Sequence, residues 1–176
     1  MLTAYTDGGA RGNPGPAGYG VQVVDESGLV VAELHDGLGR TTNNVAEYRG
    51  LLAALSWAVA NHASPLRIRM DSELIVNQMT GRYKVKHPGL QPLHAEAKRL
   101  VSQVGRVVFE HVRRDQNREA DRLSNLGMDL AEGRPHPPQQ PPAQDAERRV
   151  QAPPRPQPAS LAGARPARLE FDVPDE

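Results

Sequence analysis

Two short apolar segments of this sequence, residues 2–6 and 66–70, each end at an aspartate, Asp7 and Asp71. The sequence between them includes residues 43–61, whose apolar positions recur at spacings of three and four, as in an amphipathic helix. A helix that crosses over between two strands implies that the strands are parallel in one sheet. Parallel strands end at the same edge, so we expect Asp7 and Asp71 to lie together.

The rest of the first 130 residues continues this mixed pattern. It predicts strands at residues 2–6, 19–25, 29–34, 66–71 and 107–112, and helices at residues 43–61, 73–80, 91–104 and 117–130. A turn at residues 26–28 makes the second and third strands an antiparallel hairpin, whereas the helical crossovers make strands one, four and five parallel. The predicted fold is therefore α/β, a five-stranded mixed sheet flanked by helices.

The composition changes near residue 131. Residues 131–176 are dominated by Pro, Gln, Ala and Arg and contain few bulky apolar side chains. Such a segment buries too little apolar surface to offset the entropy lost on ordering. We therefore predict a folded domain at residues 1–130 and a disordered Pro-rich tail at residues 131–176. The tail could dock through residues 169–173 on an unknown partner, or tether another domain.

Composition also excludes several kinds of site. The chain has no cysteine, which rules out disulfides and thiolate metal ligands and suits a reducing cytoplasm. No apolar run approaches the ~18 residues of a membrane helix, and the amino terminus lacks the pattern of a signal peptide. Lys plus Arg and Asp plus Glu both number 21, so nucleic-acid contacts would depend on local patches. We expect a cytoplasmic monomer that does not bind membranes.

Two further acidic residues are placed where this fold could bring them to the same edge. Glu47 lies one turn into helix 43–61, and Asp121 lies near the start of helix 117–130. Clustered carboxylates raise one another's pKa unless a cation lies between them. Oxygen ligands without His or Cys suit Mg²⁺ or Mn²⁺ rather than Zn²⁺. Two such ions about 3.5–4 Å apart can hold both reacting oxygens of a phosphodiester.

Each acidic residue alone also has a simple structural explanation. Asp7 before two glycines is typical of a turn, and Glu47 can complete a capping box. Ser72 and Asn117 can be helix N-caps, and Asp121 can be a solvated acid near a helix amino terminus. Their common placement at one edge favours the functional interpretation.

Four segments resemble the motifs of the type 1 ribonuclease H family (ribonuclease HI). Residues 7–20, DGGARGNPGPAGYG, are similar to the first motif, and residues 41–47, TTNNVAE, to the second. Residues 71–73, DSE, resemble the third motif, and residues 117–121, NREAD, the fourth. The resemblance covers about residues 1–128 with all four motifs in order.

The resemblance implies a catalytic domain at residues 1–130 that cleaves the RNA strand of RNA/DNA hybrids, leaving 5′-phosphate and 3′-hydroxyl ends. The implied catalytic and metal-binding residues are Asp7, Glu47, Asp71 and Asp121. By the same analogy Asp7 bridges two Mg²⁺ ions, for which Mn²⁺ can substitute. Glu47 and Asp71 would hold one ion, and Asp121 would hold the ion that activates water.

The resemblance also implies how substrate is held. The implied contacts are Gly12, Asn13, Arg40, Thr42, Asn43, Asn44 and Asn117. Asn13 and Asn43 would meet RNA 2′-hydroxyls, which distinguish RNA from DNA. Arg40 and Thr42 resemble positions that grip a phosphate of the DNA strand.

Three features depart from the family pattern. Glu73 stands where many relatives carry Gln. Residues 113–116 lack the His that assists proton transfer or product release in many relatives, and His111 is predicted to lie on a strand. Residues 82–88 run almost directly into the next helix, so this is a form without the basic protrusion. Basic side chains of this segment could form a small phosphate patch or serve only solubility: Arg82, Lys84 and Lys86. We expect modest affinity with a strong salt dependence.

Three other functions compete with hybrid cleavage. Relatives without the protrusion include some that also act on double-stranded RNA. A catalytically silent domain could bind hybrid and use the tail to recruit a partner, although such a domain has no need for four clustered acids. A DNA nuclease or integrase-like enzyme is disfavoured, because Asn13 and the Asn43–Asn44 pair suit 2′-hydroxyls.

Overall fold

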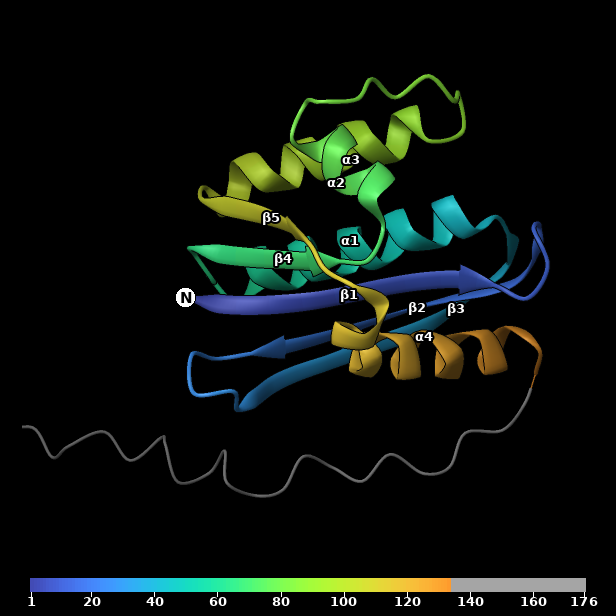
Figure 1. Ribbon diagram of the computed structural model, residues 1–176, viewed down its shortest axis with the longest axis horizontal. Helices are drawn as coiled ribbons and strands as arrows, with labels where there is room; N and C mark the ends of the chain where they lie inside the picture. Colours follow the sequence, from blue (N-terminus) through green and yellow to red (C-terminus); the bar gives the residue numbers. More distant parts are fainter. Residues whose placement is uncertain (134–176) are drawn as a thin grey trace, which may run out of the picture. The chain divides into compact units, whose positions relative to one another are not determined.

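The structure, a computed structural model, describes residues 1–133 and contains a five-stranded mixed sheet (Figure 1). The strands are β1 (Leu2–Ala10), β2 (Gly15–Val24), β3 (Val30–Thr41), β4 (Leu66–Met70) and β5 (Val107–His111). Their order in the sheet is β3-β2-β1-β4-β5. Strands β1, β2 and β3 pair antiparallel, whereas β4 pairs parallel with both β1 and β5. The predicted fold class, element order and strand directions are therefore confirmed.

Helices cover both faces of the sheet. They are α1 (Asn43–Ala60), α2 (Glu73–Met79), α3 (Gln91–Val104) and α4 (Arg118–Ala131), with a short 3₁₀ helix η1 (Arg114–Gln116) before α4. In Figure 1, α1 lies behind β1 and β4, with α2 and α3 above it, whereas α4 lies in front of β2 and β3. The core beneath α1 contains fully buried Leu51, Leu55 and Ile68.

Glycines let the two main helices touch the sheet backbone directly. A Cβ on Gly18 would lie 2.3 Å from the Gly127 carbonyl carbon of α4, and one on Gly20 would lie 2.4 Å from Leu123 Cβ. On the opposite face, a Cβ on Gly8 would lie 2.3 Å from the Ala46 backbone of α1. These strand glycines mark close approach between elements.

Glycines within the strands, including Gly37 and Gly39 of β3, also explain where the predicted strand boundaries were wrong. Strand β1 continues to Ala10 rather than residue 6, and β2 begins at Gly15 rather than residue 19, so the expected loop of residues 8–18 shrinks to four residues, 11–14. Strand β3 runs to Thr41 rather than residue 34. Glycine lowers strand propensity; here packing against the helices outweighs it. The 3₁₀ helix η1 was not predicted.

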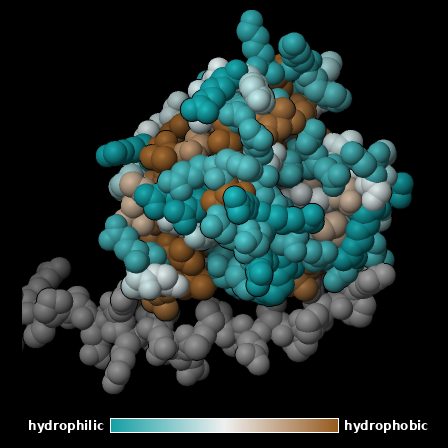
Figure 2. All heavy atoms as spheres, in the orientation of Figure 1, coloured by the Kyte–Doolittle hydropathy of each residue, from teal (hydrophilic) through white to brown (hydrophobic). Residues whose placement is uncertain are grey.

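The domain boundary expected at residue 130 lies next to the last residue of α4, Ala131. Most of the tail predicted at residues 131–176 lies outside the described residues, as does the docking segment at residues 169–173. Figure 2 shows a largely hydrophilic face interrupted by small hydrophobic patches. No helix within residues 1–133 is long and apolar enough to cross a bilayer.

Candidate active site

Asp7 and Asp71 emerge side by side at one edge of the sheet. Strands β1 and β4 are parallel neighbours, and their paired residues include Thr6 with Met70, each directly before one of the two aspartates. Asp7 is 8% exposed, and Asp71 follows the last residue of β4. The juxtaposition expected from the sequence is therefore present.

Helix α1 brings Glu47 to the same edge. Its first turn starts at the N-cap Thr42, whose Oγ1 accepts a hydrogen bond from Val45 N at 3.4 Å. The backbone of Ala46 then packs against Gly8, the residue after Asp7. The Glu47 carboxylate is mostly buried and hydrogen-bonds with Ser72. Glu47 therefore faces the aspartates rather than completing a capping box with its own helix.

Helix α4 brings Asp121 to the site from the opposite face of the sheet. Asn117, which precedes α4 and is 1% exposed, donates from Nδ2 to Thr6 O at 2.9 Å and so ties the helix start to β1. About two turns later, Ser124 Oγ donates to Asp7 Oδ2 at 2.6 Å. Asp121 lies between them, with Oδ1 3.9 Å from the Arg114 guanidinium.

Two carboxyl groups of the site, those of Asp7 and Glu47, have raised pKa values. Burial raises the pKa of Asp7 to about 7; the Ser124 hydrogen bond opposes this rise, and the charges of Asp71 and Asp121 add to it. Burial likewise raises the pKa of Glu47 to about 7, opposed by Ser72 and reinforced by Asp7 and Asp71. These mutual repulsions show that the four carboxylates share one electrostatic environment, which a cation would relieve.

The donor set fits a hard divalent cation in its chemistry. All four candidate ligands are carboxylates, the groups that Mg²⁺ and Mn²⁺ prefer. His111, the nearby strand residue, has Nε2 3.3 Å from Asp71 O. Within the described part of the chain, no three His, Cys, Asp or Glu side chains already converge on one metal position.

The loop that joins β1 to β2 is fastened to both helices that carry acidic residues of the site. Asn43 Oδ1 accepts from Ala10 N at 2.7 Å, and Asn13 Oδ1 accepts from Asn43 N at 3.2 Å. On the other side, Arg11 pairs with Asp129 at 2.7 Å and Glu132 at 2.8 Å, at the end of α4. Exposed Gly12 and Asn13 therefore sit on an anchored loop beside the carboxylates.

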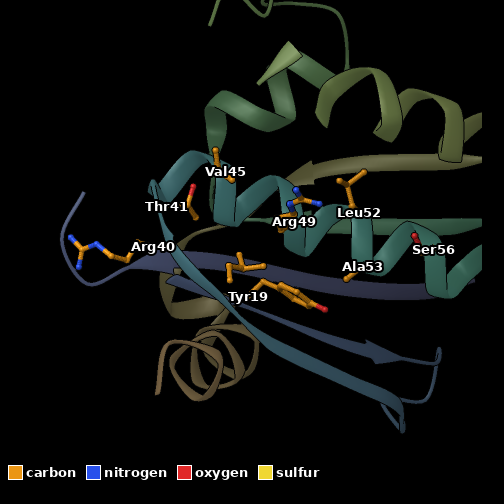
Figure 3. Close-up of a pocket in the computed structure, with 9 residues that line it drawn as sticks. Tyr19, Arg40, Thr41, Val45, Arg49, Leu52, Ala53 and Ser56 are labelled. Carbon is orange, nitrogen blue, oxygen red and sulfur yellow. The ribbon is translucent and has the colours of Figure 1, made fainter. Parts of the chain in front are cut away.

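The other predicted substrate residues have different surroundings. Arg40 and Asn44 are exposed, Arg40 near the end of β3 and Asn44 in the first turn of α1. Arg40 lines a pocket of about 510 Å³ between β3 and α1, shown in Figure 3. Thr42 doubles as the α1 cap. Asn117 is buried at the start of α4, so its observed contact positions β1 and α4, and its side chain does not cap the helix.

Sequence reasoning missed three supporting residues. Ser72 was considered only as a cap; its hydroxyl does accept from Ile75 N at 3.4 Å, and it also hydrogen-bonds with Glu47. Ser124 lies three residues after Asp121, so helical spacing could have placed it on the same side of α4. The sequence around Arg114 did not indicate a role in the site, because its position beside Asp121 depends on the short helix η1.

The structure shows where the three features that depart from the family pattern lie. Residues 80–90 connect α2 to α3 without any helix of their own, and Arg82, Lys84 and Lys86 on this connection are exposed. Glu73 is exposed in the first turn of α2. In place of a loop bearing a helper His, η1 carries Arg114, Asp115 and Gln116.

Comparison with known proteins gives a consistent result. A family model described as "Reverse transcriptase-like" matches residues 5–127. "Bifunctional protein Rv2228c" of Mycobacterium tuberculosis is 53% identical over 126 residues, which are 71% of this chain and 35% of that protein. "Ribonuclease HI" of Halobacterium salinarum is 41% identical over 128 residues, covering 73% of this chain and 64% of the relative. The chain thus spans about a third of the first of these relatives and less than two thirds of the second.

A solved structure is similar to this chain over nearly the whole length of the solved protein. It is described as LC11-RNase H1 in complex with RNA/DNA hybrid, and it superposes with a TM-score of 0.71 at 44% identity. The match covers 75% of this chain and 99% of that structure. The similarity therefore extends over the whole sheet and the helices that carry the four acidic residues.

Proposed function

Because this chain belongs to the type 1 ribonuclease H family, we propose that it is a divalent-metal-dependent endoribonuclease that hydrolyses the RNA strand of RNA/DNA hybrids. The observation that carries the proposal is the placement of Asp7, Glu47, Asp71 and Asp121 around one sheet edge, where burial and neighbouring carboxylates raise the pKa values of Asp7 and Glu47 to about 7. A domain that only bound nucleic acid would gain nothing from gathering anions where phosphates must approach.

We assign the metal ligands as part of this proposal. Asp7 would contact two Mg²⁺ or Mn²⁺ ions, Glu47 and Asp71 would hold one of them, and Asp121 the other. When bound, the ions supply a nucleophilic water at neutral pH and stabilise charge on the phosphate. The side chains themselves supply position: Ser124 orients Asp7, and Ser72 orients Glu47.

The proposed reaction is hydrolysis of a phosphodiester. The oxygen of water forms a bond to phosphorus, and the bond between phosphorus and the RNA 3′-oxygen breaks. The leaving oxygen takes up a proton, so the products are a 5′-phosphate and a 3′-hydroxyl. Asn13 and Asn43 would contact 2′-hydroxyls of the RNA strand, which distinguish it from DNA, and Gly12 and Asn44 would contact the groove of the hybrid. Arg40 and Thr42 would hold the DNA strand through a phosphate.

Hybrid is the substrate that the comparisons favour, since the LC11 relative was solved with RNA/DNA hybrid. Double-stranded RNA is a second candidate substrate, because the connection at residues 80–90 has no basic protrusion. We expect the protein to act as a monomer in the cytoplasm, a compartment that suits a chain without cysteine.

A panel of labelled substrates tests the proposal. The full chain should cut the RNA of a hybrid with Mg²⁺ or Mn²⁺, and should cut neither its DNA strand nor duplex DNA. EDTA should abolish cleavage. Comparable cleavage of duplex RNA would extend the substrate class. Binding of hybrid without cleavage under either metal would overturn the enzyme assignment in favour of a silent binding domain.

A further inference from the structure

A groove on the outer side of α1 is separate from the carboxylates and carries two arginines. It has a volume of about 510 Å³ and lies between α1 and strands β2 and β3. Its lining includes Arg40, Thr41, Arg49 and Ser56, with apolar Leu52 and the ring of Tyr19. Figure 3 shows Tyr19 along the floor, Arg49 and Leu52 on α1, and Arg40 projecting from β3.

The two arginines are available to an anion. Arg11, Arg67, Arg69, Arg99, Arg114 and Arg122 each lie within ion-pair distance of a carboxylate. Among residues 1–133, neither Arg40 nor Arg49 has such a partner, and both are exposed. No Asp or Glu of the described residues lines the groove. A guanidinium with free donors is suited to phosphate.

Hydroxyl groups add neutral donors to the same surface. Thr41 lies at the mouth of the groove beside Arg40, and Ser56 lies near its far end on α1. Burial raises the pKa of Tyr19, and the nearby charge of Asp36 raises it further, so the phenol stays protonated as a donor. Because the whole chain balances 21 basic with 21 acidic residues, this local pair of positive charges is not part of a general basic field.

The groove leads away from the proposed DNA-phosphate position. Thr42 caps α1, and Arg49 follows seven residues later, which is about 10 Å along the helix axis. Successive phosphates of one strand advance by about 3.4 Å along a duplex, so a DNA strand that ran along α1 would cover this distance in roughly three nucleotides. Glu47 faces the sheet edge, whereas Arg49 lies on the exposed side of the helix.

We propose that this groove is a second phosphate-binding site, with Arg49 as its principal cation, which takes the DNA strand of a bound hybrid beyond the phosphate held at Arg40 and Thr42. The proposal rests on the hybrid-cleaving function above. It assigns to Arg49 a contact that extends the binding surface without touching the scissile phosphate. The contact should therefore affect affinity and its salt dependence, and leave the chemical step unchanged.

Arg49→Gln tests the site, with Arg106→Gln as a matched control at an exposed arginine just before β5, at the start of that strand rather than at the carboxylate edge. Hybrid binding by the full chain is measured in Ca²⁺ at several salt concentrations. Loss of one phosphate contact should lower the slope of log K against log salt by about 1 and weaken binding several-fold. The control should match the wild type. An unchanged slope in Arg49→Gln would overturn the proposal.

Trimmed hybrids identify the source of the phosphate. The RNA strand is kept constant while the DNA strand is shortened from each end in turn. The Arg49→Gln defect should disappear once DNA is removed from one end and persist when it is removed from the other. A defect that is independent of DNA length, or removed by inorganic phosphate alone, would mean that the groove binds free phosphate and would overturn the DNA-strand assignment. Wild-type cleavage of the shortest hybrid reports separately on the proposed function.

Discussion

The Ser124 hydroxyl donates a hydrogen bond of 2.6 Å to Asp7 Oδ2, linking α4 to the acidic residue at the centre of the site. This bond favours the ionised form of Asp7 against the effect of burial. We predict that Ser124→Ala raises the Mg²⁺ concentration needed for half-maximal cleavage. Partners that orient a metal ligand typically contribute about 10–100-fold in metal affinity or activity.

Ser102→Ala is the matched control for this variant. Ser102 is also a helical serine, and its hydroxyl donates to Lys98 O on exposed α3, away from the carboxylates. It should leave the Mg²⁺ dependence unchanged. Equal Mg²⁺ titrations for Ser124→Ala and wild type would show that the hydrogen bond does not tune Asp7.

A stability measurement tests the close packing of α4 on β2. A Cβ on Gly20 would lie 2.4 Å from Leu123 Cβ and from the Ser124 backbone, so Gly20→Ala must push the helix away. We predict a loss of roughly 1–3 kcal/mol or more in unfolding free energy, as for other overpacked cores. A Cβ on Gly9 would first meet the flexible Met128 Cε at 3.4 Å, so Gly9→Ala should lower the unfolding free energy clearly less. Denaturant unfolding of both variants measures these losses. Equal losses of unfolding free energy in Gly20→Ala and Gly9→Ala would contradict the close packing of α4 on β2.

Stability in EDTA should fall as pH rises. The pKa of Asp7 is raised from 3.8 to about 7 in the folded state. The folded protein therefore holds this proton more tightly than the unfolded chain, and the stability contributed below about pH 4 is lost as pH approaches 7. Asp7→Asn removes this dependence, so its Tm advantage over wild type should grow by several degrees between pH 4 and pH 8. Glu47 should cause a smaller loss in Asp7→Asn than in wild type, because the charge of Asp7 contributes to the raised pKa of Glu47.

Asp115→Asn, which changes an exposed acidic residue of η1, is the control for thermal melts across this pH range. Mg²⁺ at pH 8 should then raise the Tm of wild type more than that of Asp7→Asn, because a ligand of the folded state stabilises it. A constant difference between wild type and Asp7→Asn from pH 4 to pH 8 would contradict the raised pKa.

Arg11 should matter for binding more than for chemistry. Its ion pairs with Asp129 and Glu132 anchor the loop that carries Gly12 and Asn13. We predict that Arg11→Ala raises KM for hybrid by roughly 3- to 10-fold, equivalent to about 1 kcal/mol, with kcat little changed. Arg11→Lys should restore part of the loss. A fall in kcat without a change in KM would contradict this role.

Much of the fold followed from the sequence because its periodic signals are local. The apolar spacing of residues 43–61 and the short apolar runs before Asp7 and Asp71 predicted α1, β1 and β4 and their parallel pairing. The extents of β1, β2 and β3 did not follow, because glycines weaken a strand pattern. Their role at Gly18 and Gly20 depends on a helix more than 95 residues away in the sequence.

The proximity of the four acidic residues could be predicted because each belongs to an ordered motif. Their environment could not be predicted. Glu47 hydrogen-bonds with Ser72 rather than within its own helix, and Asn117 anchors β1 rather than capping α4. The position of Arg114 beside Asp121 depends on η1, whose short sequence carries no periodic signal. Such contacts arise only when the sheet edge is assembled.

Cleavage of a hybrid labelled on its RNA strand, by wild type and by Asp7→Asn in parallel, tests the central claim most directly. Wild type with Mg²⁺ should produce RNA fragments with 5′-phosphate and 3′-hydroxyl ends, and none in EDTA. Asp7→Asn should remain folded and bind hybrid but lose cleavage. Cleavage by Asp7→Asn at the wild-type rate would contradict the assignment of this edge of the sheet as the active site.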